Sequence, residues 1–279
     1  MRIGVPESVY TAQDGAEQRP HVTVCDNILR MATYVLVHGA WHGSWCWKRV
    51  RKALQAAGHD VFTPTLTGVG ERSHLGSTSV SLSTHIADVE NLIRWEELSD
   101  VILCGHSYGG CVISGVADRV PERIQALVYL DAFVLENGEC LFDLVTPEQV
   151  QGMRQQAQAA GDGWKTAPIP AEAFGVNARD AAWVNAQCTP QPLATFEERI
   201  KLTGGIARIP DITHVLATGF TEGSPFPQSH ERAKAKGWKT AKIACGHDVM
   251  LDLPDELTRL LLDRAASQAA EKARQTSAP

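Results

Sequence analysis

Residues 101–110 of the chain read VILCGHSYGG, an apolar run followed at once by a serine set among glycines. The apolar run is typical of a buried parallel strand, and the small-residue segment 109–117 is typical of a helix packed closely on a sheet. A serine in a sharp turn between strand and helix tolerates only small residues two positions to either side, where Gly105 and Gly109 stand. The stretch therefore predicts an α/β fold with Ser107 as a nucleophile.

The alternation of strands and helices continues on both sides of this turn. From Thr33 onward, short apolar runs alternate with helical patterns, which is the signature of β-α-β units and a parallel sheet. The predicted fold class is α/β, with a mainly parallel sheet of about six strands flanked by helices. Strands are expected at residues 33–37, 60–64, 100–104, 125–130, 213–217 and 239–244. Helices are expected at residues 45–57, 83–98, 109–120 and 229–235 and from Pro254 onward, with fraying after Ala265.

The interval from about 134 to 210 breaks this alternation. It contains Gln/Ala-rich stretches such as 149–160 and no convincing strand, and it is too long for a loop. We therefore expect a helical cap inserted between two strands of a single domain at residues 33–279. Three aromatic side chains of this interval either line a pocket beneath the cap or fill its own small core: Trp164, Phe174 and Trp183.

Composition indicates the class of protein and its compartment. The chain has 279 residues, 44% of them hydrophobic, which is ample for one large α/β domain. Its net charge of −6 and the lack of a long basic run argue against nucleic acid and an anionic membrane surface as partners. Seven cysteines without a C-x-x-C pair indicate free thiols in a reducing cytosol. No stretch approaches the ~20 apolar residues of a membrane span, so we expect a soluble, cytoplasmic protein.

The first 32 residues are expected to form an N-terminal extension. They are polar, show no clear period and develop no apolar region of the kind that a secretory signal needs. A short edge strand at residues 22–24 is the alternative.

Serine is a poor nucleophile on its own, so an imidazole must take its proton and a carboxylate must hold that imidazole. Of ten histidines, His247 is the best placed, because it follows the strand 239–244. It then lies at the carboxyl edge of the sheet, as Ser107 does. His106 would leave the turn in another direction, and His214 begins a strand at the opposite edge.

Two carboxylates are candidates for the acid. Asp131 ends the strand 125–130 at the carboxyl edge, and a carboxylate buried there needs a hydrogen-bond partner such as an imidazole. Glu222 is the nearest carboxylate after the strand 213–217, where no aspartate stands. We favour Asp131 and keep Glu222 as the alternative.

The first strand runs into a second glycine-rich loop, HGAWHG at residues 38–43. A tetrahedral acyl intermediate needs two N–H groups aimed at its oxyanion, one from the residue after the nucleophile and one from this loop. We assign them to Tyr108 and Ala40. His38 and His42 are four residues apart, but they lie on a loop with no third ligand in view, so no metal is expected.

Residues 33–265 resemble the α/β-hydrolase superfamily. More narrowly, residues 34–47 resemble the branch that holds plant methylesterases, salicylate-binding esterases, hydroxynitrile lyases and bacterial carboxylesterases, including pyrethroid hydrolases. The resemblance implies a Ser/His/acid triad, a small cap over the pocket and no cofactor. Haloalkane dehalogenases are similar at the strand before the cap, and one group keeps its acid at the place matching Asp131. Their nucleophile is an aspartate where this chain has Ser107, so dehalogenation is not expected.

Two departures argue against a lyase. Hydroxynitrile lyases of this branch carry a threonine in the oxyanion loop and a lysine after the catalytic histidine, where Gly39 and Asp248 stand here. An acidic Asp248 would oppose a developing cyanide anion. We therefore predict a serine carboxylesterase for small to medium hydrophobic esters such as pyrethroids, acting through an acyl-serine intermediate. A lyase or acyltransferase on the same scaffold and a non-catalytic small-ligand receptor are the alternatives. The substrate pocket is assigned to Trp41, Phe133, Trp164 and Trp183.

Overall fold

The structure, a computed structural model, describes residues 31–219 and 223–276. Six strands pair in parallel to form one sheet, in the order β2-β1-β3-β4-β7-β8. The predicted α/β class and six-stranded sheet are therefore confirmed. The strands of this sheet are β1 (Thr33–Val37), β2 (Asp60–Phe62), β3 (Val101–His106), β4 (Ile124–Leu130), β7 (Asp211–Ala217) and β8 (Lys239–Ile243).

Two strand boundaries differ from the prediction in ways that matter. β2 ends at Phe62, ahead of Pro64, which has no N–H for a strand ladder. β7 begins at Asp211, so His214 lies within the strand rather than at its start. The placement of His214 at the opposite edge of the sheet was therefore wrong.

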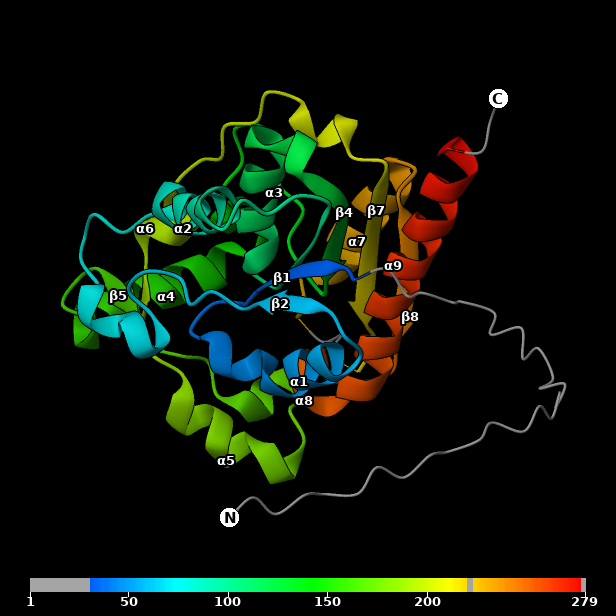
Figure 1. Ribbon diagram of the computed structural model, residues 1–279. Helices are drawn as coiled ribbons and strands as arrows, with labels where there is room; N and C mark the ends of the chain where they lie inside the picture. The colour runs from blue at the N-terminus through cyan, green and yellow to red at the C-terminus, as the bar shows by residue number, and fades with distance from the viewer. Residues whose placement is uncertain (1–30, 220–222, 277–279) are drawn as a thin grey trace, which may run out of the picture.

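Helices cover both faces of the sheet (Figure 1). Strand side chains alternate between the faces, so Tyr34 and Leu36 pack toward one helical layer and Val35 and Val37 toward the other. The first layer consists of α1 (Lys48–Ala56), α8 (Val249–Asp252) and α9 (Pro254–Thr276); the second consists of α2 (Leu82–Trp95), α3 (Gly109–Arg119) and α7 (Phe226–Ala235). Short 3-10 helices lie at Ser44–Trp47, Gly70–Leu75, Pro121–Arg123, Leu141–Leu144, Ala171–Phe174 and Gly205–Arg208.

Helix ends follow their local sequence. α1 is followed by Gly58, whose left-handed φ of 87° is typical of a glycine just after a helix C-terminus. α9 starts at Pro254, as predicted. The prediction that this last helix frays after Ala265 was wrong, because α9 continues to Thr276.

Between β4 and β7 the chain forms the cap, with α4 (Pro147–Ala160), α5 (Ala178–Gln187) and α6 (Ala194–Glu197). The expectation of no strand here was wrong, since β5 (Lys165–Thr166) pairs antiparallel with β6 (Gln191–Pro192). Two residues are too few to give an alternating pattern in the sequence.

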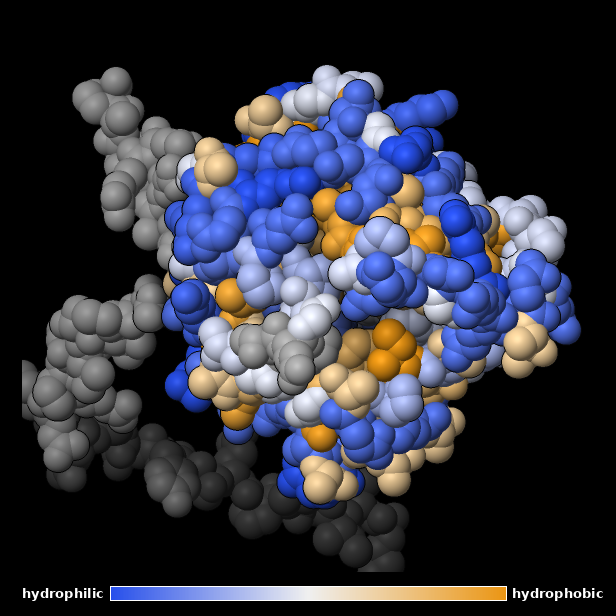
Figure 2. Space-filling view, turned by 180° about the vertical axis from the view of Figure 1, so that it is seen from behind, coloured by the Kyte–Doolittle hydropathy of each residue, from blue (hydrophilic) through white to orange (hydrophobic). Residues whose placement is uncertain are grey.

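Figure 2 shows a mostly hydrophilic face with hydrophobic residues gathered near its centre. No helix in the described part of the chain has the length and apolarity needed to cross a membrane. The cysteines within residues 31–219 and 223–276 are free thiols. The possible edge strand at 22–24 lies outside the described residues. Large hydrophobic side chains of the described residues that are exposed are Met31, Leu75, Trp95 and Trp183.

Candidate active site

Ser107 lies in the turn between β3 and α3 with a left-handed backbone, at a φ of 54°. Residues other than glycine rarely adopt this conformation, and it persists only where the surroundings impose it. A Cβ at Gly105 would lie 2.6 Å from the Gly109 carbonyl oxygen, and one at Gly109 would lie 2.8 Å from the Val37 carbonyl oxygen. The predicted need for small residues around Ser107 is therefore confirmed.

His247 and Asp131 meet at the carboxyl edge of the sheet. The Nδ1 atom of His247 lies 2.7 Å from Oδ2 of Asp131, and both side chains are buried. The other carboxylate oxygen of Asp131 accepts the Ala217 N–H at 3.0 Å. Like Ser107, Asp131 has a left-handed backbone, with a φ of 41°. The alternative acid, Glu222, lies outside the described residues.

Burial dominates the protonation of this pair. It lowers the pKa of His247 to about 4, an effect that the nearby Asp248 charge opposes. Burial also raises the pKa of Asp131, whereas the hydrogen bond from Ala217 lowers it. The imidazole is therefore neutral at pH 7. Its short contact with Asp131 assigns the proton to Nδ1, so Nε2 carries the lone pair that a general base needs.

Ser107 and His247 border an apolar cavity of about 100 Å³ beneath the cap. Two of the predicted pocket residues, Trp41 and Phe133, line it. Most of the remaining wall could not be predicted from the sequence, because apolar residues of the cap follow no period that distinguishes a cavity from a core. Phe174, one of the three cap aromatics expected either to line a pocket or to fill the cap core, lines the cavity. The other lining residues include Leu141, Val145, Met153, Ile169, Phe196 and Phe226.

The structure places the other two predicted pocket residues elsewhere. Trp164 borders a separate surface depression, where the Lys165 ammonium lies 5.2 Å from its ring centroid. Trp183 stacks edge-on against Trp45 at 5.1 Å and remains 38% exposed. It lies on α5, whose apolar residues pack with the α1 layer rather than over Ser107.

The predicted oxyanion loop is pinned by the cap. The Trp41 N–H donates to Gln191 at 3.1 Å, and the indole N–H donates to the Thr166 carbonyl at 3.3 Å. Trp41 itself has a left-handed φ of 63°. Ala40 and Tyr108 both border the cavity, and within the described residues neither donates its backbone N–H to a protein acceptor.

The two residues at which the chain differs from the hydroxynitrile lyases, Gly39 and Asp248, lie in different surroundings. A Cβ at Gly39 would lie 2.8 Å from Nδ1 of His106 and 2.9 Å from Cβ of Ser107, so a threonine does not fit there without movement. Asp248 does not line the cavity at all; it is fully buried and its Oδ2 lies 3.1 Å from Nε2 of His42. Its charge is therefore paired with His42 and does not face a substrate directly.

Both ring nitrogens of His38 are engaged in hydrogen bonds. His38 faces the Gly39 carbonyl through Nδ1 and accepts the Leu66 N–H through Nε2. Among the residues that the structure describes, the side chains with converging ligand atoms are His106, His247 and Asp248, whose atoms lie within 4.8 Å of one another.

This group of three is not arranged as a ligand set. Nε2 of His106 lies 3.1 Å from the His247 carbonyl oxygen and donates to it, so that nitrogen has no lone pair for a cation. His106 was not predicted to belong to the site. Its position directly before Ser107 in the sequence is the signal that could have indicated that it lies there.

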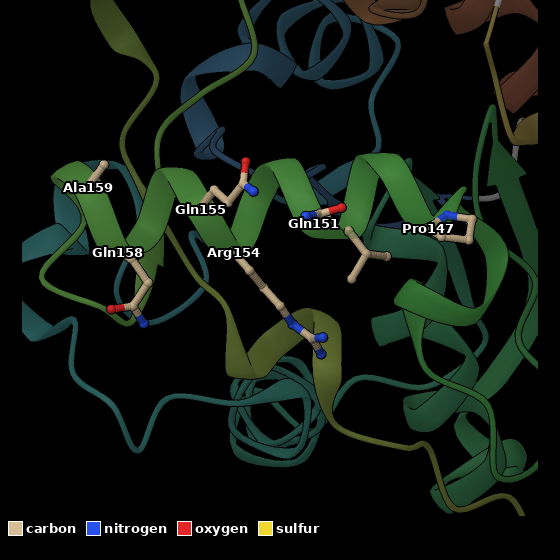
Figure 3. A pocket seen from close by; sticks show the side chains of 7 residues that line it. Pro147, Gln151, Arg154, Gln155, Gln158 and Ala159 are labelled. Atoms are coloured by element: carbon tan, nitrogen blue, oxygen red, sulfur yellow. The ribbon is translucent and has the colours of Figure 1, made fainter.

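A larger depression runs along α4, away from Ser107 (Figure 3). It is bordered mainly by glutamine side chains, and Arg154 projects from it toward α6, where it pairs with Glu197 at 2.9 Å. Neither Ser107 nor His247 borders this depression, so the predicted nucleophile and base lie at the small apolar cavity instead.

Comparison with known proteins gives consistent results. Residues 34–260 match the model of the alpha/beta hydrolase family. The chain is 48% identical over 240 residues to the carbendazim hydrolyzing esterase of Nocardioides sp. (strain SG-4G), a match that covers 83% of this chain and 98% of that protein. It is 33% identical to methylesterase 2 of Arabidopsis thaliana over 107 residues, which are 38% of this chain and 41% of that protein.

Solved structures share the fold. An extracellular alpha/beta-hydrolase from a Paenibacillus species superposes with a TM-score of 0.73 at 24% identity, covering 84% of this chain and 98% of that one. A pyrethroid hydrolase from Sphingobium faniae JZ-2 superposes with a TM-score of 0.67 at 22% identity, covering 86% and 99%. The resemblance predicted from the oxyanion loop and the serine turn is thereby confirmed.

Proposed function

This chain belongs to the alpha/beta hydrolase family and is a carboxylic ester hydrolase, and we propose that it works through an acyl-serine intermediate on Ser107. One observation carries the proposal. A serine in a left-handed turn borders the same apolar cavity as His247, whose second nitrogen is bonded to the buried Asp131. These are the residue types and connections that acyl transfer requires.

In the first half-reaction the Ser107 oxygen forms a bond to the ester carbonyl carbon while its proton passes to Nε2 of His247. The N–H groups of Ala40 and Tyr108 hold the resulting oxyanion. The tetrahedral intermediate then breaks its bond to the alcohol oxygen, and His247 gives that oxygen the proton. Asp131 keeps the imidazole in its tautomer and stabilises the imidazolium that forms.

Water completes the reaction. His247 takes a proton from a water molecule, whose oxygen attacks the acyl carbon of the intermediate. The bond from that carbon to the Ser107 oxygen breaks, and His247 returns the proton to the serine. The net change is ester plus water to acid plus alcohol, with no cofactor.

The cavity wall supports hydrophobic substrates with a small or planar acyl part. Apart from Ser107, His247 and the exposed Gln149, the side chains that border it are apolar or aromatic. Among the substrates we propose methyl esters of aromatic acids and carbamates of aromatic amines, since a relative at 48% identity is a carbendazim hydrolyzing esterase. Pyrethroid esters are a larger class that would require the cap to open. The free thiols support a reducing compartment such as the cytoplasm.

The test compares wild-type protein with Ser107→Ala on a chromogenic aryl ester and on carbendazim. We expect turnover of the aryl ester by the wild type and a loss of about 10⁶-fold in kcat in the variant, as for other serine hydrolases that lose the nucleophile. Mass spectrometry should show one acyl or phosphonyl adduct on Ser107 in the wild type only. Turnover that persists in Ser107→Ala would exclude Ser107 as the nucleophile.

A further inference from the structure

Asp248, directly after His247, is a buried carboxylate that the proposed reaction does not use. It is fully buried, and its Oδ2 lies 3.1 Å from Nε2 of His42. Nδ1 of His42 lies 2.7 Å from the Ala40 carbonyl oxygen. Both nitrogens of His42 therefore face acceptors, and only an imidazolium can donate from both.

The electrostatics agree with a charged pair. Burial lowers the pKa of His42, but the Asp248 carboxylate and the hydrogen bond to the Ala40 carbonyl together raise it above its ordinary value. Burial raises the pKa of Asp248, but His42, with smaller effects from His106 and His247, brings it below its ordinary value. Isolated charges at these positions would each be strongly disfavoured, so the two depend on one another.

The pair connects two loops that are far apart in the sequence. His42 belongs to the loop after β1, and Asp248 to the loop after β8. The peptide between Ala40 and Trp41 is held at both ends, because its carbonyl accepts from His42 and its N–H donates to Gln191. This restricts the direction of the adjoining Ala40 N–H toward the cavity.

The second carboxylate oxygen of Asp248, Oδ1, faces His106, which packs against His247. Oδ1 lies 3.7 Å from Nε2 of His106 and makes no hydrogen bond among the described residues. The His106 ring is tilted by 42° relative to the His247 ring, with the centroids 4.4 Å apart, and donates to the His247 carbonyl. The Asp248 charge raises the pKa of His247, and the His42 charge lowers it.

Other ionisable groups around this centre are neutral or already described. Burial lowers the pKa of His106 well below its ordinary value, so this ring is uncharged. Asp131 faces His247 from the end of β4. Burial, with a smaller effect from the Asp248 charge, raises the pKa of three thiols, which are therefore protonated at pH 7: Cys46, Cys188 and Cys245.

We propose that His42 and Asp248 form an ion pair that positions the Ala40 N–H for the oxyanion and balances the charge around His247. The inference rests on the proposed serine esterase function. Both are positioning residues, because neither borders the cavity. The pair lets a carboxylate lie beside the catalytic imidazole without trapping it in the protonated state, since the His42 charge offsets the Asp248 charge.

The test uses Asp248→Asn and His42→Gln, which keep hydrogen-bonding side chains of similar size but remove one charge each. We expect kcat for an aryl ester to fall about 10- to 100-fold in both variants, with KM nearly unchanged, because a misdirected oxyanion donor affects the transition state more than the ground state. The acid limb of kcat/KM should move to lower pH in both variants, because a buried partner left without its counter-charge becomes neutral. The Asp248 charge, which raises the pKa of His247 more than the His42 charge lowers it, is then lost.

A common shift to lower pH is the signature of the charged pair, because a general loss of packing would lower stability without moving the limb. Asp118→Asn is the matched control. The Asp118 carboxylate, near the C-terminal end of α3, is also buried and accepts the backbone N–H groups of residues 203–205, so this variant should lower stability without moving the acid limb. Limbs that coincide with the wild type in both variants, or that shift in opposite directions, overturn the proposal.

A second measurement is independent of turnover. In the wild type, the ¹⁵N NMR spectrum at pH 7 should show His42 with both ring nitrogens protonated, and the His247 titration should shift in the two variants as the acid limb does. A neutral His42 overturns the ion pair even if esterase activity is normal. Failure of Ser107→Ala to abolish turnover instead overturns the serine mechanism and leaves the NMR result standing. If one variant does not fold, the acid limb of the other variant and the NMR titration test the proposal.

Discussion

His247 Nδ1 contacts Asp131 Oδ2 at 2.7 Å, although the two residues are 116 positions apart in the sequence and the whole cap is inserted between them along the chain. Asp131 follows β4 and His247 follows β8, and β7 lies between these strands in the sheet. The Asp131 carboxylate therefore spans β7, bonding the Ala217 N–H with one oxygen and the imidazole with the other. Neither oxygen is left without a donor, which makes a buried carboxylate tolerable at this edge.

Asp131→Asn should cost about 10⁴-fold in kcat, as neutralising a triad aspartate does elsewhere. The amide oxygen can still accept the Ala217 N–H, so the fold should persist while the imidazole loses its tautomer. Steady-state kinetics with a matched melting curve check this. Near-normal turnover in Asp131→Asn, together with an inactive Glu222→Gln, would transfer the role to Glu222.

The pH dependence of kcat/KM for a neutral ester should show an acid limb well below pH 6.5. Burial lowers the pKa of His247 to about 4, and the protonated imidazole cannot accept the Ser107 proton. Activity is therefore present above this pKa and lost as the pH falls through it. A limb at or above pH 6.5 would mean that the imidazolium is favoured in the free enzyme, contrary to the burial of His247.

Local pattern accounts for the parts of this molecule that the sequence analysis predicted. Ser107 could be found because a strained turn needs glycines at fixed offsets, and Asp131 because it ends a buried strand. Trp164 and Trp183 were misplaced because which face of a cap helix meets the sheet depends on packing that no period encodes. The partner of Asp248 was invisible for a similar reason, since His42 lies 206 positions away.

Gly39→Ala should lower both stability and turnover. The added methyl group would lie 2.8 Å from Nδ1 of His106 and 2.9 Å from Cβ of Ser107, and overpacking of this kind typically costs about 1–3 kcal/mol. Gly152→Ala is the matched control, because it lies within α4 with nothing within 4 Å and should stabilise by about 1 kcal/mol. Denaturant unfolding and kcat check both. A Gly39→Ala variant as stable and active as the wild type would show that the oxyanion loop yields without cost.

Acid should destabilise the fold through a buried histidine pair that does not border the cavity. Nε2 of His214 donates to the Ala132 carbonyl at 3.1 Å, and its Nδ1 lies 3.1 Å from Nδ1 of His230. Burial lowers the pKa of His214 to about 4, so between pH 6.5 and 4 the unfolded chain binds a proton that the folded chain does not. Stability is therefore lost as the pH falls through this window, by up to about 1.4 kcal/mol per pH unit for this one group.

His214→Gln separates this proton linkage from packing. The amide can still donate to Ala132 but cannot titrate, so we expect lower stability at pH 7, by about 1–3 kcal/mol, and a flatter dependence on pH. Urea unfolding at pH 7.0, 6.0 and 5.0 measures the slope in both proteins. Because only His214 is replaced, the difference between the slopes reports on His214 together with its contact to His230. Parallel slopes would show that His214 takes up its proton equally in the folded and unfolded chains, and hence that burial does not hold it neutral.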